Sequence, residues 1–304
     1  MTEPQTRTWT PNWPCPVGAV LRVHRRGAGD PTYQVLPDGA HARAMRSPDG
    51  PVTLRVEPLD SAGRVVAQAW GSGATWALDH LPTMLGADDD PSGFEPHHDV
   101  VAAEWKRQPH WRLGRTGLVM ESLVPTIIEQ KITGQEAFGA FRTLVRRYGE
   151  RAPGDLGLLL QPTPETLRTI PSWEWLKIPV DGGRSRPLLA AARVASSIER
   201  AGRASFEEFD RRLRSIPGIG VWSSGEVRAT ALGDPDAVSF GDYHIAKNIT
   251  WALTGEQGDD DALAELLTPY AGHRHRVQHL LAGAGRPRRG PRMSPRTHLP
   301  GSSR

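Results

Sequence analysis

Cysteine is scarce in this sequence: the 304 residues contain one, Cys15. A single thiol cannot form an internal disulfide, and it excludes iron–sulfur clusters and zinc sites that are built on several cysteines. Long apolar runs are also missing, since no stretch approaches the roughly 20 residues needed to cross a bilayer. The polar N-terminus, MTEPQTRTWTPNW, lacks the apolar core of a signal peptide. We therefore expect a cytoplasmic protein that contacts no membrane.

Acidic residues are absent from residue 271 to the C-terminus, a segment that holds eight arginines. This local positive charge favours attraction to a polyanion without identifying which one. The alternative is a solvated, unstructured terminus, and we expect residues 286–304 to form a disordered basic tail. The whole chain has a net charge of only +3. Its 38% of hydrophobic residues and ten tryptophans are enough for a folded core.

The first part of the chain carries strand patterns. Apolar and polar residues alternate over 52–57, which predicts a half-buried strand, and 64–70 reads as the returning strand that pairs with it. The stretch 86–93 (GADDDPSG) has no periodicity and marks a domain boundary. We therefore expect a flexible segment over 1–12 and a β-rich lobe over 13–86.

Beyond this boundary, apolar residues recur at helical spacing. Thr133 and Glu136 have the spacing of a capping box, in which each satisfies a free backbone amide at the start of a helix. Thr163 and Ser205 begin two further helical patterns in the same way. We therefore expect an α+β protein, in which an all-helical domain over 94–285 follows the β-rich lobe.

Residues 216–220 (IPGIG) separate two of these predicted helices. Helix, tight turn and helix together describe a helix–hairpin–helix. Gly218 and Gly220 lack side chains, so a phosphate group can approach the N–H groups of the backbone there. Pro217 presets the entry into the turn, and Ile219 anchors the turn to the core. Such a turn holds a DNA backbone without reading its sequence. The alternative is an ordinary corner between two helices.

Asp242 follows Gly220 by 22 residues and precedes a helical pattern over 243–249. As the N-cap of that helix it would contribute about 1 kcal/mol to stability, and it need do nothing more. The functional interpretation uses the same geometry, because a helix start favours an ionised carboxylate. A fixed anion stabilises the positive charge that develops on a sugar when its N-glycosidic bond breaks. In that case the hairpin holds the phosphates while Asp242 faces the deoxyribose.

These residues resemble the helix–hairpin–helix DNA glycosylase superfamily, and its bacterial 3-methyladenine DNA glycosylase II type in particular. The resemblance rests on IPGIGVW, on the spacing to DPDAVSFGDYHI and on LVPTIIEQKITGQEAFGAFRTLVRRYGE, and it covers roughly residues 14–285. It implies excision of damaged, often alkylated, bases that are flipped out of the duplex. It also implies that Asp242 is the catalytic residue and that Pro217, Gly218, Ile219 and Gly220 bind phosphate.

One position bears on the mechanism that the resemblance implies. Bifunctional members carry a lysine directly after the hairpin, where its amine forms a Schiff base with the sugar, but here that residue is Trp222. Simple hydrolysis is therefore expected, with no cofactor and no metal. Trp222 and Tyr243 would line the base pocket, where an aromatic face attracts a cationic alkylated base. Trp222 has an alternative role, which is packing beneath the hairpin.

Relatives insert a wedge residue into the DNA stack from the loop between two early helices. The matching loop contains Gln130, Lys131 and Ile132, with Lys131 at the wedge position. Either neighbour is an alternative wedge, and Lys131 could instead contact a phosphate.

We therefore predict a monofunctional DNA glycosylase that acts on alkylated, 3-methyladenine-like bases in duplex DNA, as part of base excision repair. We expect a monomer that is associated with the nucleoid. The alternative is a non-catalytic binder of damaged or distorted DNA. The polar wedge position fits that alternative, as does the stretch 282–285 (AGAG), where relatives often carry aromatic residues.

Overall fold

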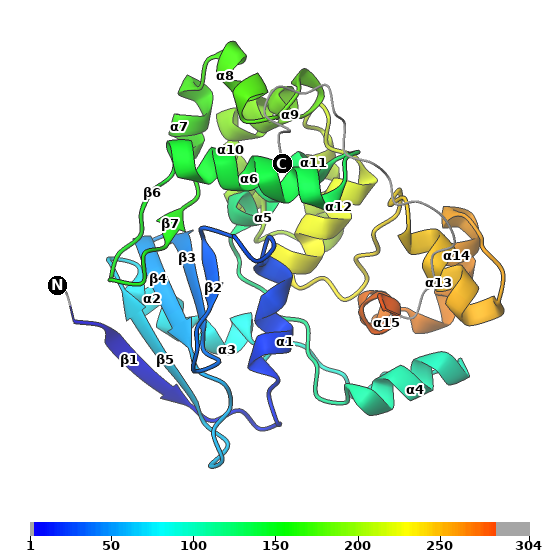
Figure 1. Cartoon of the computed structure of the whole chain (residues 1–304). Coiled ribbons are helices and arrows are strands. Elements are labelled where there is room, and N and C mark those ends of the chain that lie inside the picture. Colours follow the sequence, from blue (N-terminus) through cyan, green and yellow to red (C-terminus); the bar gives the residue numbers. More distant parts are fainter. Residues whose placement is uncertain (1–2, 284–304) are drawn as a thin grey trace.

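Five antiparallel strands form the sheet of the N-terminal lobe, in the order β1-β5-β4-β3-β2 (Figure 1). The strands are β1 (Gln5–Trp9), β2 (Tyr33–Val35), β3 (His41–Ser47), β4 (Gly50–Val56) and β5 (Val65–Trp70). The helices of this lobe are α1 (Val17–Leu21), the 3-10 turn Arg22–His24, α2 (Ala74–Asp79) and α3 (Leu81–Met84). This computed structural model describes residues 3–283, so the predicted basic tail over 286–304 lies outside the described residues.

The second part of the chain is mostly helical. Its helices are α4 (Asp99–Arg107), α5 (Val119–Glu129), α6 (Gly134–Tyr148), α7 (Pro164–Thr169), α8 (Ser172–Lys177), α9 (Gly182–Arg193), α10 (Ala195–Ala201), α11 (Phe206–Arg214), α12 (Val221–Val227), α13 (Ile245–Thr254), α14 (Asp260–Leu266) and α15 (Arg274–Leu281). A π-helical turn over Arg228–Leu232 prolongs α12, and a 3-10 turn spans Thr268–Tyr270. Two short strands, β6 (Glu150–Arg151) and β7 (Leu159–Leu160), also belong to this part. The predicted α+β class is confirmed, although the second part is not purely helical.

The alternation that predicted a strand over 52–57 is visible in the sheet. Val52, Leu54 and Val56 of β4 are buried in the core of the lobe. Thr53 between them is buried as well, because the opposite face of the sheet is covered by the segment that joins β6 to β7. Its hydroxyl donates a hydrogen bond to the Pro153 carbonyl at 2.6 Å. Both faces of the central strands are therefore covered.

Two segments of the lobe differ from the prediction. Residues 1–12 were expected to be flexible, but β1 lies within them and pairs with β5 from Gln5 opposite Ala69 to Trp9 opposite Val65. This pairing satisfies the backbone groups along the edge of β5. A short helix, α1, replaces part of the expected strand region and buries three apolar side chains against the sheet: Val17, Val20 and Leu21.

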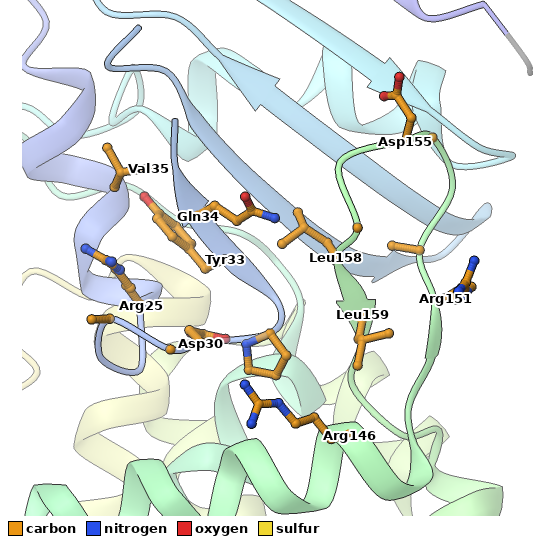
Figure 2. A pocket seen from close by; sticks show the side chains of 16 residues that line it. Arg25, Asp30, Tyr33, Gln34, Val35, Arg146, Arg151, Asp155, Leu158 and Leu159 are labelled. Carbon is orange, nitrogen blue, oxygen red and sulfur yellow. The ribbon is translucent and has the colours of Figure 1, made fainter. Parts of the chain in front are cut away.

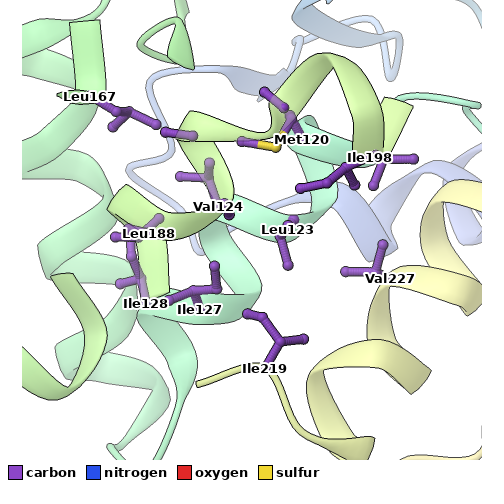
Figure 3. Close-up of a cluster of buried hydrophobic side chains, with 14 of the residues drawn as sticks. Met120, Leu123, Val124, Ile127, Ile128, Leu167, Leu188, Ile198, Ile219 and Val227 are labelled. Carbon is purple, nitrogen blue, oxygen red and sulfur yellow. The ribbon is translucent and has the colours of Figure 1, made fainter. Parts of the chain in front are cut away.

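Helix α5 lies at the centre of the main helical core (Figure 3). It is buried over nearly its whole length because its sequence, VMESLVPTIIE, is apolar on almost every side. The helices around it supply the facing side chains, among them Leu167, Leu188, Ile198 and Val227. Ile219 of the hairpin also reaches this core. Helices α9 and α10 follow each other directly, with Val194 between them.

A separate core holds α4, α13, α14 and α15 together, at the right of Figure 1. The segment 233–244 leaves the π-helical turn after α12 and enters this second core, where Val238 is buried. It therefore crosses from one helical core to the other, and Asp242 lies on it. Within residues 3–283, no helix is long and apolar enough to cross a membrane.

Candidate active site

The predicted helix–hairpin–helix is present between α11 and α12. Ile216 and Ile219 are buried in the main core, whereas Pro217, Gly218 and Gly220 are exposed at the tip. Gly218 has φ +87°, a left-handed conformation that favours glycine. The turn is thus anchored by its two isoleucines and offers only backbone and a proline ring to an approaching ligand.

Asp242 was predicted to be the N-cap of a helix beginning at Tyr243, but the N-cap residue is His244 and α13 begins at Ile245, so Asp242 lies two residues before the cap position. Its Oδ1 atom accepts hydrogen bonds from the backbone N–H groups of His244 at 2.7 Å and Ile245 at 2.9 Å. The carboxylate therefore holds the turn that leads into α13. Its second oxygen, Oδ2, accepts no hydrogen bond from the residues that the structure describes, and the side chain is half-buried.

The segment that carries Asp242 is fastened to three different elements. Near its start, Asp234 is buried and forms an ion pair of 2.9 Å with Arg228. In its middle, the Ser239 N–H donates to Oε1 of Gln278 on α15 at 2.9 Å. Directly before Asp242, the Gly241 N–H donates to Oδ2 of Asp260 on α14 at 2.8 Å. These bonds fix the position of Asp242 independently of α13.

The two aromatic residues that were predicted for a base pocket lie in different surroundings. Trp222 is half-buried, and a side chain at Gly241 would come within 3.7 Å of its Cβ atom, so it lies beside the Asp242 segment. Its Nε1 atom is buried with no hydrogen-bond partner among the described residues. Tyr243 is 66% exposed, with the Lys247 ammonium 4.5 Å above its ring.

The predicted wedge loop is hydrogen-bonded to the hairpin. Nε2 of Gln130 donates to the Gly218 carbonyl at 3.0 Å and to the Ser223 hydroxyl at 2.8 Å. Ile132 is partly buried against the main core. Lys131 is exposed between them, and its φ of +56° is left-handed, which is unusual for a residue with a side chain. Of the three alternatives, Lys131 is the one that is exposed, whereas Gln130 and Ile132 are partly buried.

Comparison of the whole fold with solved structures gives strong matches. The 3-methyladenine DNA glycosylase from Archaeoglobus fulgidus superposes with a TM-score of 0.73 at 18% identity, covering 91% of this chain and 97% of that one. The 8-oxoguanine glycosylase/lyase of Clostridium acetobutylicum, solved with duplex DNA, gives a TM-score of 0.69 at 11% identity, covering 92% and 96%. The chain has the fold of the helix–hairpin–helix DNA glycosylases.

Sequence comparison adds a relative from Mycobacterium tuberculosis. It is described as a probable bifunctional transcriptional activator/DNA repair enzyme AlkA, and it is 25% identical over 232 residues, or 73% of this chain. The match covers 46% of the relative, so the chain spans about half of that protein's length. No protein-family model matches the chain. The resemblance inferred from the hairpin and its spacing to Asp242 is thereby confirmed.

Sequence reasoning missed three charged residues near the Asp242 segment. Glu226 lies one helical turn after Trp222 on α12, and its carboxyl group accepts a hydrogen bond from the Ser239 hydroxyl. Glu129, at the end of α5, forms an ion pair of 2.7 Å with Arg26 from the N-terminal lobe. The four-residue spacing from Trp222 was a signal for Glu226. No local signal pointed to Arg26, which lies far away in the sequence.

A cavity of the described part of the chain lies away from these residues. It has a volume of about 660 Å³ and opens between edge strand β2 and the β6–β7 segment (Figure 2). Arg25, Arg146 and Arg151 line it, but none of the predicted site residues does. No group of three or more His, Cys, Asp or Glu side chains within 3–283 is placed to hold a metal ion.

Proposed function

We propose that the chain is a monofunctional DNA glycosylase. It hydrolyses the N-glycosidic bond of damaged, alkylated bases such as 3-methyladenine in duplex DNA and acts in base excision repair. The name of the Archaeoglobus fulgidus structure, a 3-methyladenine DNA glycosylase, supports this substrate class. The observation that carries the proposal is the carboxylate of Asp242, which is fixed by its segment and keeps one oxygen available.

The role of Asp242 follows from the charge that the reaction creates. As the bond between C1′ and the base breaks, positive charge develops on the sugar, and an anion held beside it lowers the barrier. The two backbone N–H groups that bind Oδ1 also keep the carboxylate in place. Oδ2 then faces the sugar and orients the attacking water. The base must leave the stack before this can happen, because the bond is inaccessible within the duplex.

The exposed hairpin supplies the grip on DNA in this proposal. The backbone of Gly218 and Gly220 binds a phosphate group. The buried side chains of Ile216 and Ile219 hold the turn in place when DNA binds. Gln130 ties the wedge loop to the same turn, so that phosphate binding and insertion of Lys131 into the stack are coupled. The partner is therefore duplex DNA that contains a damaged base, bound by a monomer.

Hydrolysis without strand cleavage follows from the residue after the hairpin. A Schiff base requires an amine at the sugar, and Trp222 has none. The Lys247 ammonium is on the next helix and lies against the Tyr243 ring. Borohydride reduction in the presence of damaged duplex should therefore trap no covalent complex, and a trapped complex would overturn the monofunctional mechanism.

The decisive experiment compares base release from methylated duplex DNA by the wild type and Asp242→Asn. Asparagine keeps an oxygen that can accept the hydrogen bonds from His244 and Ile245, so the helix cap survives while the charge is lost. We expect release of 3-methyladenine or 7-methylguanine to fall by at least about a hundredfold, with duplex affinity nearly unchanged. Asp260→Asn is the matched control: it removes the charge of a carboxylate on α14 but keeps an oxygen that can accept the Gly241 hydrogen bond, so it should retain most activity. Equal rates for wild type and Asp242→Asn would leave Asp242 as a cap only and favour a non-catalytic binder.

A further inference from the structure

A second carboxyl group lies beside the Asp242 segment. Glu226 and Trp222 are four residues apart on α12 and therefore share a helix face. Oε1 of Glu226 is hydrogen-bonded to the Ser239 hydroxyl. The carbonyl of Ser239 in turn accepts the Asp242 N–H at 3.1 Å. Glu226 is thus fixed to the same segment as Asp242, three residues before it.

The hydrogen bonds around Ser239 determine which oxygen of Glu226 can carry a proton. Nε2 of Gln278 donates to the Ser239 hydroxyl oxygen at 2.8 Å. The hydroxyl hydrogen of Ser239 is therefore left to donate to Oε1 of Glu226. When Glu226 is protonated, its hydrogen must then lie on Oε2. That oxygen has no hydrogen-bond partner within the part of the chain that the structure describes, so its proton is available to a ligand.

The charges that face Glu226 come from three other elements. Glu129 at the end of α5 and Asp242 before α13 are negative, while Arg26 of the N-terminal lobe is positive and is paired with Glu129. Burial, followed by the repulsion from Glu129 and Asp242, raises the pKa of Glu226 to about 7. A substantial fraction of Glu226 is therefore protonated at neutral pH. Two carboxyl groups in unlike surroundings are the arrangement that separates an acid from an electrostatic stabiliser.

We propose that Glu226 is a general acid that protonates neutral damaged purines as they leave the sugar. The proposal rests on the glycosylase function proposed above and extends its substrates from cationic alkylated bases to neutral ones. The Oε2–H bond breaks as a new N–H bond forms on a ring nitrogen of the purine. The electrons of the bond to C1′ pass to the base, which departs neutral, and water adds to C1′. The proton lost by that water returns the carboxylate to its acid form through the solvent.

The contrast between the two kinds of base gives the test. A cationic base such as 7-methylguanine already departs as a neutral molecule and needs no proton, whereas hypoxanthine does. Single-turnover release of both bases from otherwise identical duplexes would be measured for wild type and Glu226→Gln between pH 5.5 and 8.5. Glutamine keeps an oxygen that can accept the Ser239 hydrogen bond.

We expect hypoxanthine release by the wild type to fall about tenfold per pH unit above about 7. Glu226→Gln should slow it by about a hundredfold at pH 6 and remove this pH dependence. Release of 7-methylguanine should stay within a few-fold in both proteins. The control Glu129→Gln removes a repelling charge, so it should move the fall to lower pH without abolishing it.

Three results would overturn the proposal: no hypoxanthine release by the wild type at any pH, equal release by Glu226→Gln, or an equal loss for both bases in Glu226→Gln. In each of these cases, 7-methylguanine release by the wild type would leave the glycosylase function standing. Absence of 7-methylguanine and 3-methyladenine release would count against that function itself.

Discussion

Substitution by alanine should affect different properties at the two glycines of the hairpin: the stability of the fold at Gly218 and the affinity for DNA at Gly220. Gly218 is left-handed, with φ +87°, and a Cβ atom there would lie 2.3 Å from Cγ of Pro187. Gly220 has φ −103° and ψ −174°, which any residue adopts, and a Cβ atom there meets nothing within 4 Å. Alanine at 218 therefore disturbs the fold, whereas alanine at 220 disturbs only the outer surface of the turn.

The magnitudes follow from these two environments. Alanine in a left-handed conformation costs about 1–2 kcal/mol, and displacing the Pro187 ring, which is buried in α9, adds about 1–3 kcal/mol. Gly218→Ala should thus lower the free energy of unfolding by about 2–5 kcal/mol. Gly220→Ala should change it by no more than about 0.5 kcal/mol. Its methyl group occupies the space through which a phosphate reaches the backbone, and losing a hydrogen bond to a charged group costs about 1.5–3 kcal/mol. Duplex affinity should therefore fall about tenfold to a hundredfold.

Urea unfolding gives the stabilities, and fluorescence anisotropy with a damaged duplex at fixed salt concentration gives the affinities. Gly283→Ala is the control, because Gly283 is also exposed with nothing within 4 Å of its added Cβ atom. Wild-type affinity in a stable Gly220→Ala protein would refute phosphate binding by the hairpin. Wild-type stability in Gly218→Ala would refute the steric argument.

Two other positions give predictions of the same kind. The pKa of Glu226 is raised from 4.5 to about 7 in the fold, so its contribution to stability is fully present below about pH 4.5 and is lost as the pH rises through about 7. Glu226→Gln should hence be more stable than the wild type at pH 8, by at most about 3 kcal/mol, and should show no such gain at pH 4.5. Urea unfolding at both pH values measures this. A difference in stability that is the same at both pH values would contradict the prediction. Lys131 has φ +56°, so Lys131→Gly should raise the free energy of unfolding by up to about 1 kcal/mol while slowing base release. Lys131→Ala keeps the strain and should slow release without the gain in stability, which thermal unfolding and single-turnover kinetics would separate.

Features that depend on neighbouring residues could be predicted from the sequence. The turn at Gly218 needs a residue that tolerates a left-handed backbone, and the glycine in the IPGIG stretch predicts such a turn. The cap at Thr133 is equally local: its hydroxyl accepts the Glu136 N–H, and the Glu136 carboxylate accepts the Thr133 N–H. Asp242 was also found through its position before a helical pattern. Its helix starts later than predicted, with His244 as the N-cap and Ile245 as the first residue.

Features that depend on tertiary contacts could not be predicted. Strand β1 carries a mostly exposed, polar pattern, and only its pairing with β5 identifies it. Helix α1 has five residues, too few for helical periodicity to show. Arg26 reaches Glu129 from the other lobe, and Glu226 acquires its unusual environment only when Ser239, Glu129 and Asp242 come together. Asp242, the proposed catalytic residue, was therefore accessible to sequence reasoning, whereas the electrostatics around it were not.

The attachment of the Asp242 segment bears on the choice between a cap and a catalyst. A cap requires only that Asp242 reach the N–H groups of His244 and Ile245, which are the N-cap and the first residue of α13. The bonds from Ser239 to α15 and from Gly241 to α14 add nothing to the start of α13. They fix the backbone on the other side of Asp242, so that the direction of its remaining oxygen is determined. An oxygen that stabilises charge in a transition state must be held in place before the reaction begins, since reorienting it would use up the energy it supplies. A protein that only gripped distorted DNA would need the hairpin and the wedge loop, but it would have no use for a carboxylate held in this way.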